Sequence, residues 1–189
     1  MCPDEDAARV ELTAMLPDLR AALDRLIETD RHETAAHVLL STALVWYHEG
    51  LIREMAARLD AVAGGPELQA RTREEVLTTR AVMAKLMGDP SAAVMLGAAT
   101  DRLRPLGPDS IPLVNGLCHL AALDAEAGRR ELAFTRADKA LEVARLCPDP
   151  GSLAMALDLA SYVGWTFHEL ERAAAASAEA VVVARRSGT

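Results

Sequence analysis

Apolar residues recur at helical spacing along almost the whole chain, in blocks that glycine or proline separates. In the stretch from Leu117 to Arg145, one apolar block ends at Ala127, Gly128 follows, and a second block begins at Arg130. Apolar positions three to four residues apart predict amphipathic helices. A glycine directly after such a block predicts a left-handed residue that closes the helix. The stretch therefore predicts two helices joined by a tight turn.

The same arrangement recurs at a nearly constant interval. Gly50, Gly88 and Gly128 each end an apolar block, 38 and 40 residues apart, and His168 lies 40 residues further on. A fixed interval of 20–50 residues is the sequence signature of a helical repeat array, a solenoid. Because histidine lacks the freedom of glycine at positive φ, the turn at His168 is expected either to differ in shape or to carry mild strain.

These patterns predict an all-α fold with N-terminal helices in residues 1–30, followed by four helix pairs in one continuous array. The pairs are expected at residues 31–63, 67–104, 110–147 and 150–187. Pro17 suits the first turn of a helix that begins near Leu16, and Ser110 suits the N-cap of the helix after the most proline-rich link. The first helix of the first pair is expected to run from Glu33 to Glu49.

Composition changes this picture by excluding several classes of partner. The formal net charge is −8 at pH 7 and aromatic residues make up only 3% of the chain, which argues against direct binding of nucleic acid. Cys2, Cys118 and Cys147 form no CxxC motif, as expected for free thiols in a reducing cytoplasm. The N-terminal residues are acidic and do not show the pattern of a signal peptide, and no apolar run has the length of a membrane span. We therefore expect a cytoplasmic protein that does not bind membranes.

Candidate catalytic and metal-binding motifs fail on their spacing. His32 and His37 resemble the two ligands of a zinc-protease motif, but they are five residues apart, about 140° around a helix, where the motif needs four. Cys118 and His119 are adjacent and point in different directions on a helix, so they do not form a nucleophile and base. Glu74 and Glu75 suit the start of a helix without any catalytic role. We expect no enzyme activity, no metal and no cofactor.

The second helix pair from the C-terminus carries a family resemblance. Ala121, Ala133 and Ala140 match the small residues at the eighth, twentieth and twenty-seventh positions of tetratricopeptide repeats, although the interval of 38–40 residues exceeds the usual 34. Asp124 and Ala137 depart from the family pattern, because bulky residues are usual at their positions. The resemblance implies a right-handed α-solenoid of antiparallel helix pairs.

Two N-terminal segments are similar to a narrower group of proteins. Residues 16–24 (LPDLRAALD) and 43–50 (ALVWYHEG) resemble the start of the tetratricopeptide region in large ATP-binding bacterial transcriptional regulators, of the AfsR/SARP, LuxR and MalT-like types. In that family, the region is implied to sense an inducer or a partner protein and to control oligomerisation. The chain itself has no GxxxxGK[ST] phosphate loop and no basic recognition helix.

The family register implies a concave groove lined by the first helix of each pair. It would contain His37, Leu40, Tyr47, His48, Glu75, Thr78, Lys85, Asn115, Cys118, Glu126, Asp158, Tyr162 and Trp165. Tyrosine and tryptophan are favoured anchors of protein contacts. For Trp46 and Trp165, however, packing in the core is the more ordinary interpretation.

Two functions remain open at this point. The first is a non-catalytic scaffold that binds a protein or peptide in the groove, as the sensor or oligomerisation region of a regulator. The second is a sensor that holds a small-molecule inducer inside the superhelix, with Tyr47, His48, Tyr162 or Trp165 as contacts. Because no polar capping helix follows the last pair, the chain is also expected to be part of a longer array or to form a homo-oligomer through its C-terminal face.

Overall fold

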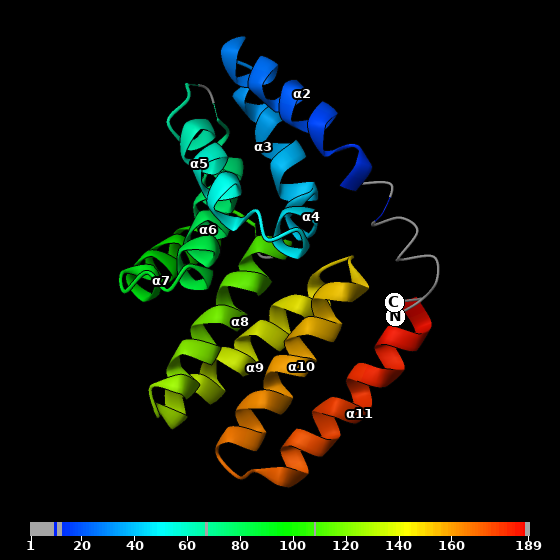
Figure 1. The fold of residues 1–189 in the computed structure, drawn as a ribbon. Coiled ribbons are helices and arrows are strands. Elements are labelled where there is room, and N and C mark those ends of the chain that lie inside the picture. The colour runs from blue at the N-terminus through cyan, green and yellow to red at the C-terminus, as the bar shows by residue number, and fades with distance from the viewer. Residues whose placement is uncertain (1–9, 11–12, 67, 108, 188–189) are drawn as a thin grey trace.

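The computed structural model describes residues 10, 13–66, 68–107 and 109–187, and in these ranges the chain is helical and contains no strand (Figure 1). The helices are α2 (Leu16–Glu28), α3 (His32–Ser41), α4 (Ala43–His48), α5 (Ile52–Ala63), α6 (Ala70–Leu86), α7 (Ala92–Leu103), α8 (Ile111–Glu126), α9 (Arg130–Leu146), α10 (Pro150–Thr166) and α11 (Leu170–Ser187). The predicted all-α fold is confirmed. Residues 4–9, which the predicted N-terminal helices include, lie outside the described residues, as does Cys2.

The helices pack mainly against helices that are close to them in sequence. α6 packs on α7, α8 on α9 and α10 on α11, while α8 also lies between α6 and α10. In Figure 1, α2 to α7 form the upper part of the molecule, and α8 to α11 lie side by side in the lower part, with α11 at the edge.

Five tight turns share one backbone geometry. Gly50, Gly88 and Gly128 have φ angles of 71°, 74° and 70°, and His168 and Asp30 have φ angles of 61° and 56°. At the glycines and His168, the amide of the left-handed residue donates to the carbonyl three residues earlier, and the next amide donates to the carbonyl five residues before it, at 2.8–3.1 Å. Asp30 makes the same pair of bonds. These are Schellman turns, so the predicted glycine turns are confirmed and His168 keeps the same shape.

Two predicted helix starts are also confirmed. α2 begins at Leu16 with Pro17 in its first turn. The hydroxyl of Ser110 accepts a hydrogen bond from the backbone amide of Leu113 and caps α8. Both features depend on chemistry within one helical turn, which explains why they can be recognised in the sequence.

The first helix of the first pair, predicted to be continuous, is instead broken at Thr42. This residue has φ −104° and ψ 8° and separates α3 from α4. Its hydroxyl donates to the carbonyl of Val38 at 2.7 Å and accepts a hydrogen bond from the indole Nε1 of Trp46 at 3.1 Å. A threonine hydroxyl that bonds the backbone in this way competes with regular helix geometry. The indole, which is completely buried, fixes the break.

Small residues let the later helices approach one another closely. Ala121 and Ala125 of α8 cluster with Ala133 and Ala137 of α9 and with Val163 of α10, and all five are buried. Helices pack at short distance only where side chains at the contact are small. Alanine therefore forms most of the buried centre of this cluster, and the partly buried Phe134 and Phe167 pack against it.

Candidate partner-binding site

The predicted groove residues of the first helix pair differ in exposure and are divided between two helices. His37, Tyr47 and His48 are exposed, whereas Leu40 is half-buried against the core. The rings of Tyr47 and His48 touch edge to face, with centroids 5.4 Å apart. His37 lies 3.5 Å from the carboxylate of Glu33 on its own helix. Because α3 and α4 are separate helices, the residues on each side of the break follow different helix axes.

On α6, the predicted groove positions are largely covered. Thr78 is completely buried and donates to the backbone carbonyl of Glu74, so it lies inside the protein and not on a surface. Glu75 is half-buried and accepts a hydrogen bond from Arg71 at 3.0 Å. Asn115, the neighbouring position on α8, is also half-buried.

The structure does bring together part of the predicted set between α6, α8 and α10. Lys85 Nζ lies 3.5 Å from the carboxylate of Glu126. Burial raises the pKa of the Cys118 thiol to about 12, and the charge of Asp158 contributes to the rise. Burial lowers the pKa of His119 to about 4, and the positive charge of Lys85 contributes to the fall. Cys118 is thus a protonated core thiol and not a nucleophile.

Three of the predicted residues form an open face on α10. Asp158, Tyr162 and Trp165 follow one another at intervals of four and three residues, which places them on one side of the helix. All three are exposed, and Trp165 is 67% exposed, so the expectation that it packs in the core was wrong. Within the described residues, no ion pair or hydrogen bond involves the carboxylate of Asp158.

The face of α8 that matches this face of α10 in the repeat is covered by a neighbouring helix. The residues 40 positions before this face are Cys118, Ala122 and Ala125, and all of them are buried. Cys118 and Ala125 share apolar clusters with residues of α10. On α10, the bulky side chains of Tyr162 and Trp165 replace the two alanines and remain open to contact.

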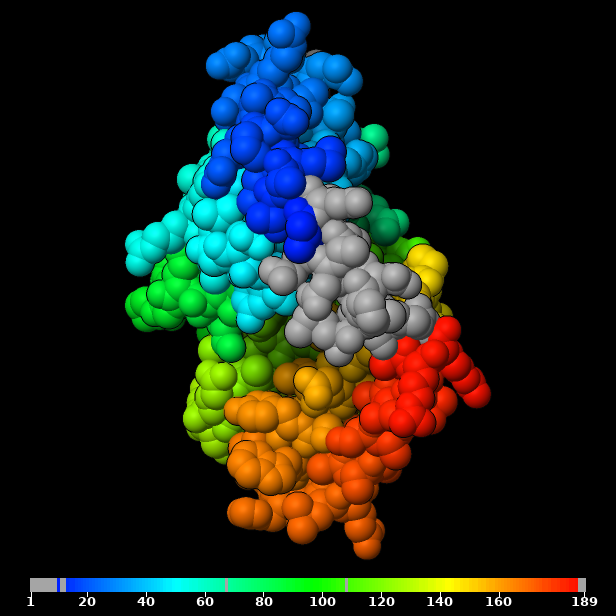
Figure 2. All heavy atoms as spheres, turned by 45° about the vertical axis from the view of Figure 1, so that its right-hand side comes forward, coloured from blue at the N-terminus to red at the C-terminus, as the bar shows by residue number. Residues whose placement is uncertain are grey.

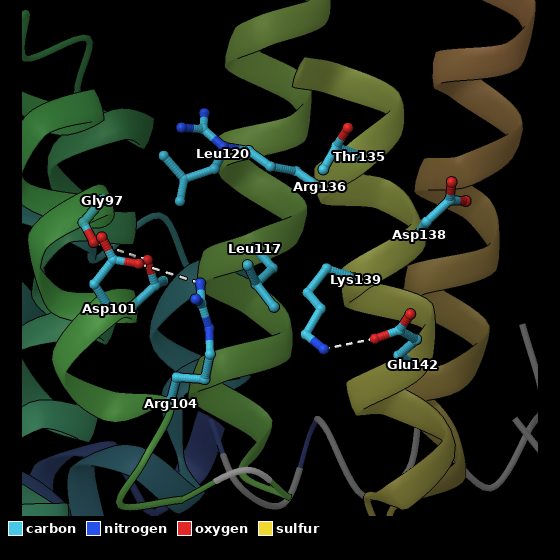
Figure 3. A pocket seen from close by; sticks show the side chains of 11 residues that line it. Gly97, Asp101, Arg104, Leu117, Leu120, Thr135, Arg136, Asp138, Lys139 and Glu142 are labelled. Atoms are coloured by element: carbon cyan, nitrogen blue, oxygen red, sulfur yellow. Dashed lines mark hydrogen bonds and ion pairs between the residues drawn. The ribbon is translucent and has the colours of Figure 1, made fainter. Parts of the chain in front are cut away.

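A hollow that sequence reasoning missed lies between α7 and α9, with α8 as its floor (Figure 3). It has a volume of about 520 Å³, and none of the thirteen predicted groove residues lines it. Leu117 and Leu120 form the apolar part of the floor, and Gly97 stands in the wall formed by α7. A second open hollow of about 470 Å³ lies between the turn at Gly50 and the end of α6. No local motif marks either hollow, because each depends on how separate helices are placed.

The charged groups around the larger hollow already have partners within the chain. The pairs are Arg104 with Asp101 at 3.1 Å, Lys139 with Glu142 at 2.6 Å, Arg136 with Asp124 at 2.5 Å, and Arg172 with Asp138. A rim with equal numbers of acidic and basic groups produces little net field. The hollow therefore exerts little electrostatic attraction on a charged ligand. The unpaired carboxylate of Asp158 on α10 attracts cations more strongly.

Comparison with known proteins adds no relative. The chain matches no model of a known protein family, and no curated protein matches it. In the described part of the chain, no group of three or more His, Cys, Asp or Glu residues is placed to hold a metal ion. None of the described helices combines the length and apolar character needed to cross a membrane.

Proposed function

We propose that this chain is a non-catalytic scaffold that binds a protein or peptide segment through the face of α10. The observation that carries the proposal is the exposure of Tyr162 and Trp165 on one side of that helix. Large aromatic side chains are enriched among the residues that contribute most binding energy in protein interfaces. Among the described residues, Tyr162 and Trp165 are the only two exposed Phe, Tyr or Trp side chains that lie on the same helix.

The chemistry of this face favours a basic partner segment. Asp158 lies one helical turn before Tyr162, and its carboxylate has no partner among the described residues. One lysine or arginine of the partner can pair with this carboxylate, and a second can lie over the indole of Trp165, two helical turns further on, because aromatic faces attract cations. The chain as a whole carries a net charge of −8, which steers positively charged segments toward it.

We further propose that this scaffold is a right-handed, tetratricopeptide-like solenoid within the sensor region of a cytoplasmic bacterial transcriptional regulator. The recurrent left-handed turns and the packing of α8 between α6 and α10 support the array. The regulator assignment rests on the resemblance of residues 16–24 and 43–50. A reading frame that also encodes a phosphate-binding loop and a DNA-binding segment would support it, and an unrelated neighbouring domain would contradict it.

Peptide binding measured by fluorescence anisotropy tests the partner site. Three labelled peptides of equal length should be compared: one rich in arginine and lysine, one neutral and one rich in glutamate. We expect the basic peptide to bind, and Trp165→Ala and Asp158→Asn each to weaken binding at least tenfold, about 1.4 kcal/mol. The matched control is Val94→Ala, which truncates an equally exposed apolar residue on α7 (76% exposed). Equal effects of Val94→Ala and Trp165→Ala would contradict the proposed site.

Tryptophan fluorescence provides an independent measurement of peptide binding at the α10 face. Trp46 is completely buried and Trp165 is exposed, so in the variant Trp46→Phe the emission reports on the α10 face alone. Binding at this face is expected to shift the emission to shorter wavelength, because the indole leaves water. A bound peptide that leaves the emission unchanged would place the site elsewhere.

A further inference from the structure

α11 has two faces of opposite character, and only one of them is covered. It packs on α10 through Ala173, Ala176, Ala180 and Val183, which are buried or half-buried. The opposite side carries Ala174, Ala175, Ala178, Val181 and Val182, with Glu171 and Arg185 at its two ends, and all seven are exposed. We call these seven residues the α11 stripe. α11 lies at the edge of the described chain in Figure 1, and Figure 2 shows it on the molecular surface.

The α11 stripe is more apolar than the exposed residues at three matching positions on α9. Val181 and Val182 are 48% and 47% exposed. Forty residues earlier on α9, the residues that match Ala175, Ala178 and Val182 are Thr135, Asp138 and Glu142. At these three exposed positions, polar residues on α9 give way to alanine and valine on α11, whereas the residues that match Ala174 and Val181 are the half-buried Phe134 and Leu141. A contiguous exposed apolar stripe on a helix marks a contact surface.

The charges of α11 divide into a paired and an unpaired group, and Arg186, which lies outside the α11 stripe, belongs to the unpaired group within the described residues. Those on the side of α9 are paired within the chain, Arg172 with Asp138 and Glu179 with Arg145. In contrast, Glu171 and Arg185 have no ion pair or hydrogen bond from their side chains among the described residues. The negative charge of Glu171 lies at the N-terminal end of the α11 stripe, and the positive charge of Arg185 lies at its C-terminal end.

The α11 stripe is symmetric about Ala178 in a way that suits contact with itself. Glu171 and Arg185 each lie seven residues from Ala178, with the acid on the N-terminal side and the base on the C-terminal side. Ala174 and Ala175 lie four and three residues before Ala178. Val181 and Val182 lie three and four residues after it. If two copies of α11 cross antiparallel at Ala178, each alanine faces a valine, and each Glu171 faces the other copy's Arg185.

We propose that this chain forms a homodimer in which two α11 helices pack antiparallel about Ala178. The occupant of the stripe is a second copy, because a single sequence supplies both halves of the charge and size complementarity. An isologous contact of this kind closes on itself and leaves no free complementary surface. The spacing of the stripe, at three, four and seven residues, is the spacing at which helices interlock, and alanine at the crossing permits close approach.

A contact between two single helices is small, which sets the expected strength of the dimer. Stable interfaces bury about 800 Å² on each partner, and a pair of helices alone lies at the low end of the range. We therefore expect dissociation at micromolar concentrations. The dimer contact lies on α11 and the proposed peptide site lies on α10, so each proposal can be tested without the other.

Sedimentation equilibrium of the whole chain, from low micromolar to about 1 mM, tests the dimer. We expect a monomer–dimer equilibrium for the unchanged chain and only monomer for Ala178→Glu, which places two like charges at the crossing. The matched control is Ala98→Glu, which adds the same charge at an exposed alanine of α7 and should leave the equilibrium unchanged. A chain that remains monomeric over the whole range would overturn the proposal, as would equal effects of the two substitutions.

Exchange of the terminal charges tests the antiparallel register. Glu171→Arg alone and Arg185→Glu alone each turn two attractive pairs into two repulsive ones, and each should raise the dissociation constant roughly tenfold. The double variant Glu171→Arg with Arg185→Glu restores opposite charges and should recover the original affinity. Single variants without effect, or a double variant that stays weak, would contradict this register. Binding of the basic peptide to monomeric Ala178→Glu is then measured separately, so that failure of the dimer does not obscure the site on α10.

Discussion

The carboxylate of Asp124 is the most deeply buried charge in an ion pair of the described chain, and its removal should destabilise the α8–α9 pair. Asp124 is 1% exposed and accepts hydrogen bonds from Arg129 Nε at 2.8 Å and from Arg136 at 2.5 Å. One acid near the end of α8 therefore holds two bases, one at the turn and one on α9. The substitution Asp124→Ala removes the acceptor that both guanidinium groups share.

The expected cost follows from the exposure of the three groups. Breaking a fully buried ion pair by removing one partner costs about 3–5 kcal/mol, because the remaining charge stays buried. The side chains of Arg129 and Arg136 are 48% and 32% exposed, so water can hydrate both of them after the change. The loss then approaches that of charged hydrogen bonds, about 2–3 kcal/mol, and the better helix propensity of alanine returns about 0.5 kcal/mol. We expect a net loss of about 2 kcal/mol, or about 4–8 °C in Tm for a chain of this length.

Urea unfolding followed by far-ultraviolet circular dichroism measures this loss. The matched control is Asp101→Ala, which removes an exposed acid (71% exposed side chain) of α7 from its pair with Arg104, the residue after the end of that helix, and should change stability by less than about 0.5 kcal/mol. Hydrogen exchange should show that the loss in Asp124→Ala is concentrated in α8 and α9, because these two helices carry the pair. If both substitutions had the same small effect, burial would not be the reason for the large contribution of Asp124 to the free energy of unfolding, and the prediction would be refuted.

Three further predictions concern single residues. Gly116→Ala should destabilise the protein by about 1–3 kcal/mol, because the added Cβ would lie 2.5 Å from a methyl group of Thr100. Gly97→Ala should stabilise the protein by about 0.5–1 kcal/mol, because its added Cβ would have no atom within 4 Å. Urea unfolding of both variants measures the difference. His168→Gly should stabilise the fold by up to about 1 kcal/mol, measured as a higher urea midpoint, because glycine adopts the observed φ of 61° without a Cβ penalty. Burial and a nearby lysine lower the pKa of His119 to about 4, below its ordinary 6.5, so its neutral form stabilises the fold above pH 6.5 and this contribution is lost as the pH falls toward 4. Thermal unfolding between pH 7 and pH 4 should show this loss in the unchanged chain and a smaller one in His119→Leu.

The parts of the fold that the sequence predicts are those set by interactions within one helical turn. The left-handed turn at Gly128 and the cap at Ser110 need only a residue type and its neighbours. The break at Thr42 was missed because its hydroxyl is fixed by the buried indole of Trp46, and burial of that ring depends on the packing of other helices. The turn at Asp30 was missed because aspartate at a left-handed position is much less recognisable than glycine.

The candidate site shows the same division more sharply. Tyr162 and Trp165 were named from the family register, and their shared helix face follows from spacing alone. Whether that face is covered cannot be derived from spacing, because the matching alanines on α8 are buried only by the placement of α10. Thr78 illustrates the opposite error, since the family register predicts it in the groove, yet its hydroxyl donates to the backbone of its own helix and the residue lies inside the protein.

The restriction of packing to helices that are close in sequence has a mechanical consequence. No extensive contact among the described helices joins α2 or α3 to α10 or α11, so a force applied along the chain is resisted by contacts between helices that are near in sequence, and not by a contact between the first and last helices. The chain should therefore yield in small steps at low force when it is stretched from its ends, and should re-form in the same short steps when released. A protein built in this way can act as a compliant link that lengthens under load without losing all of its folded structure at once.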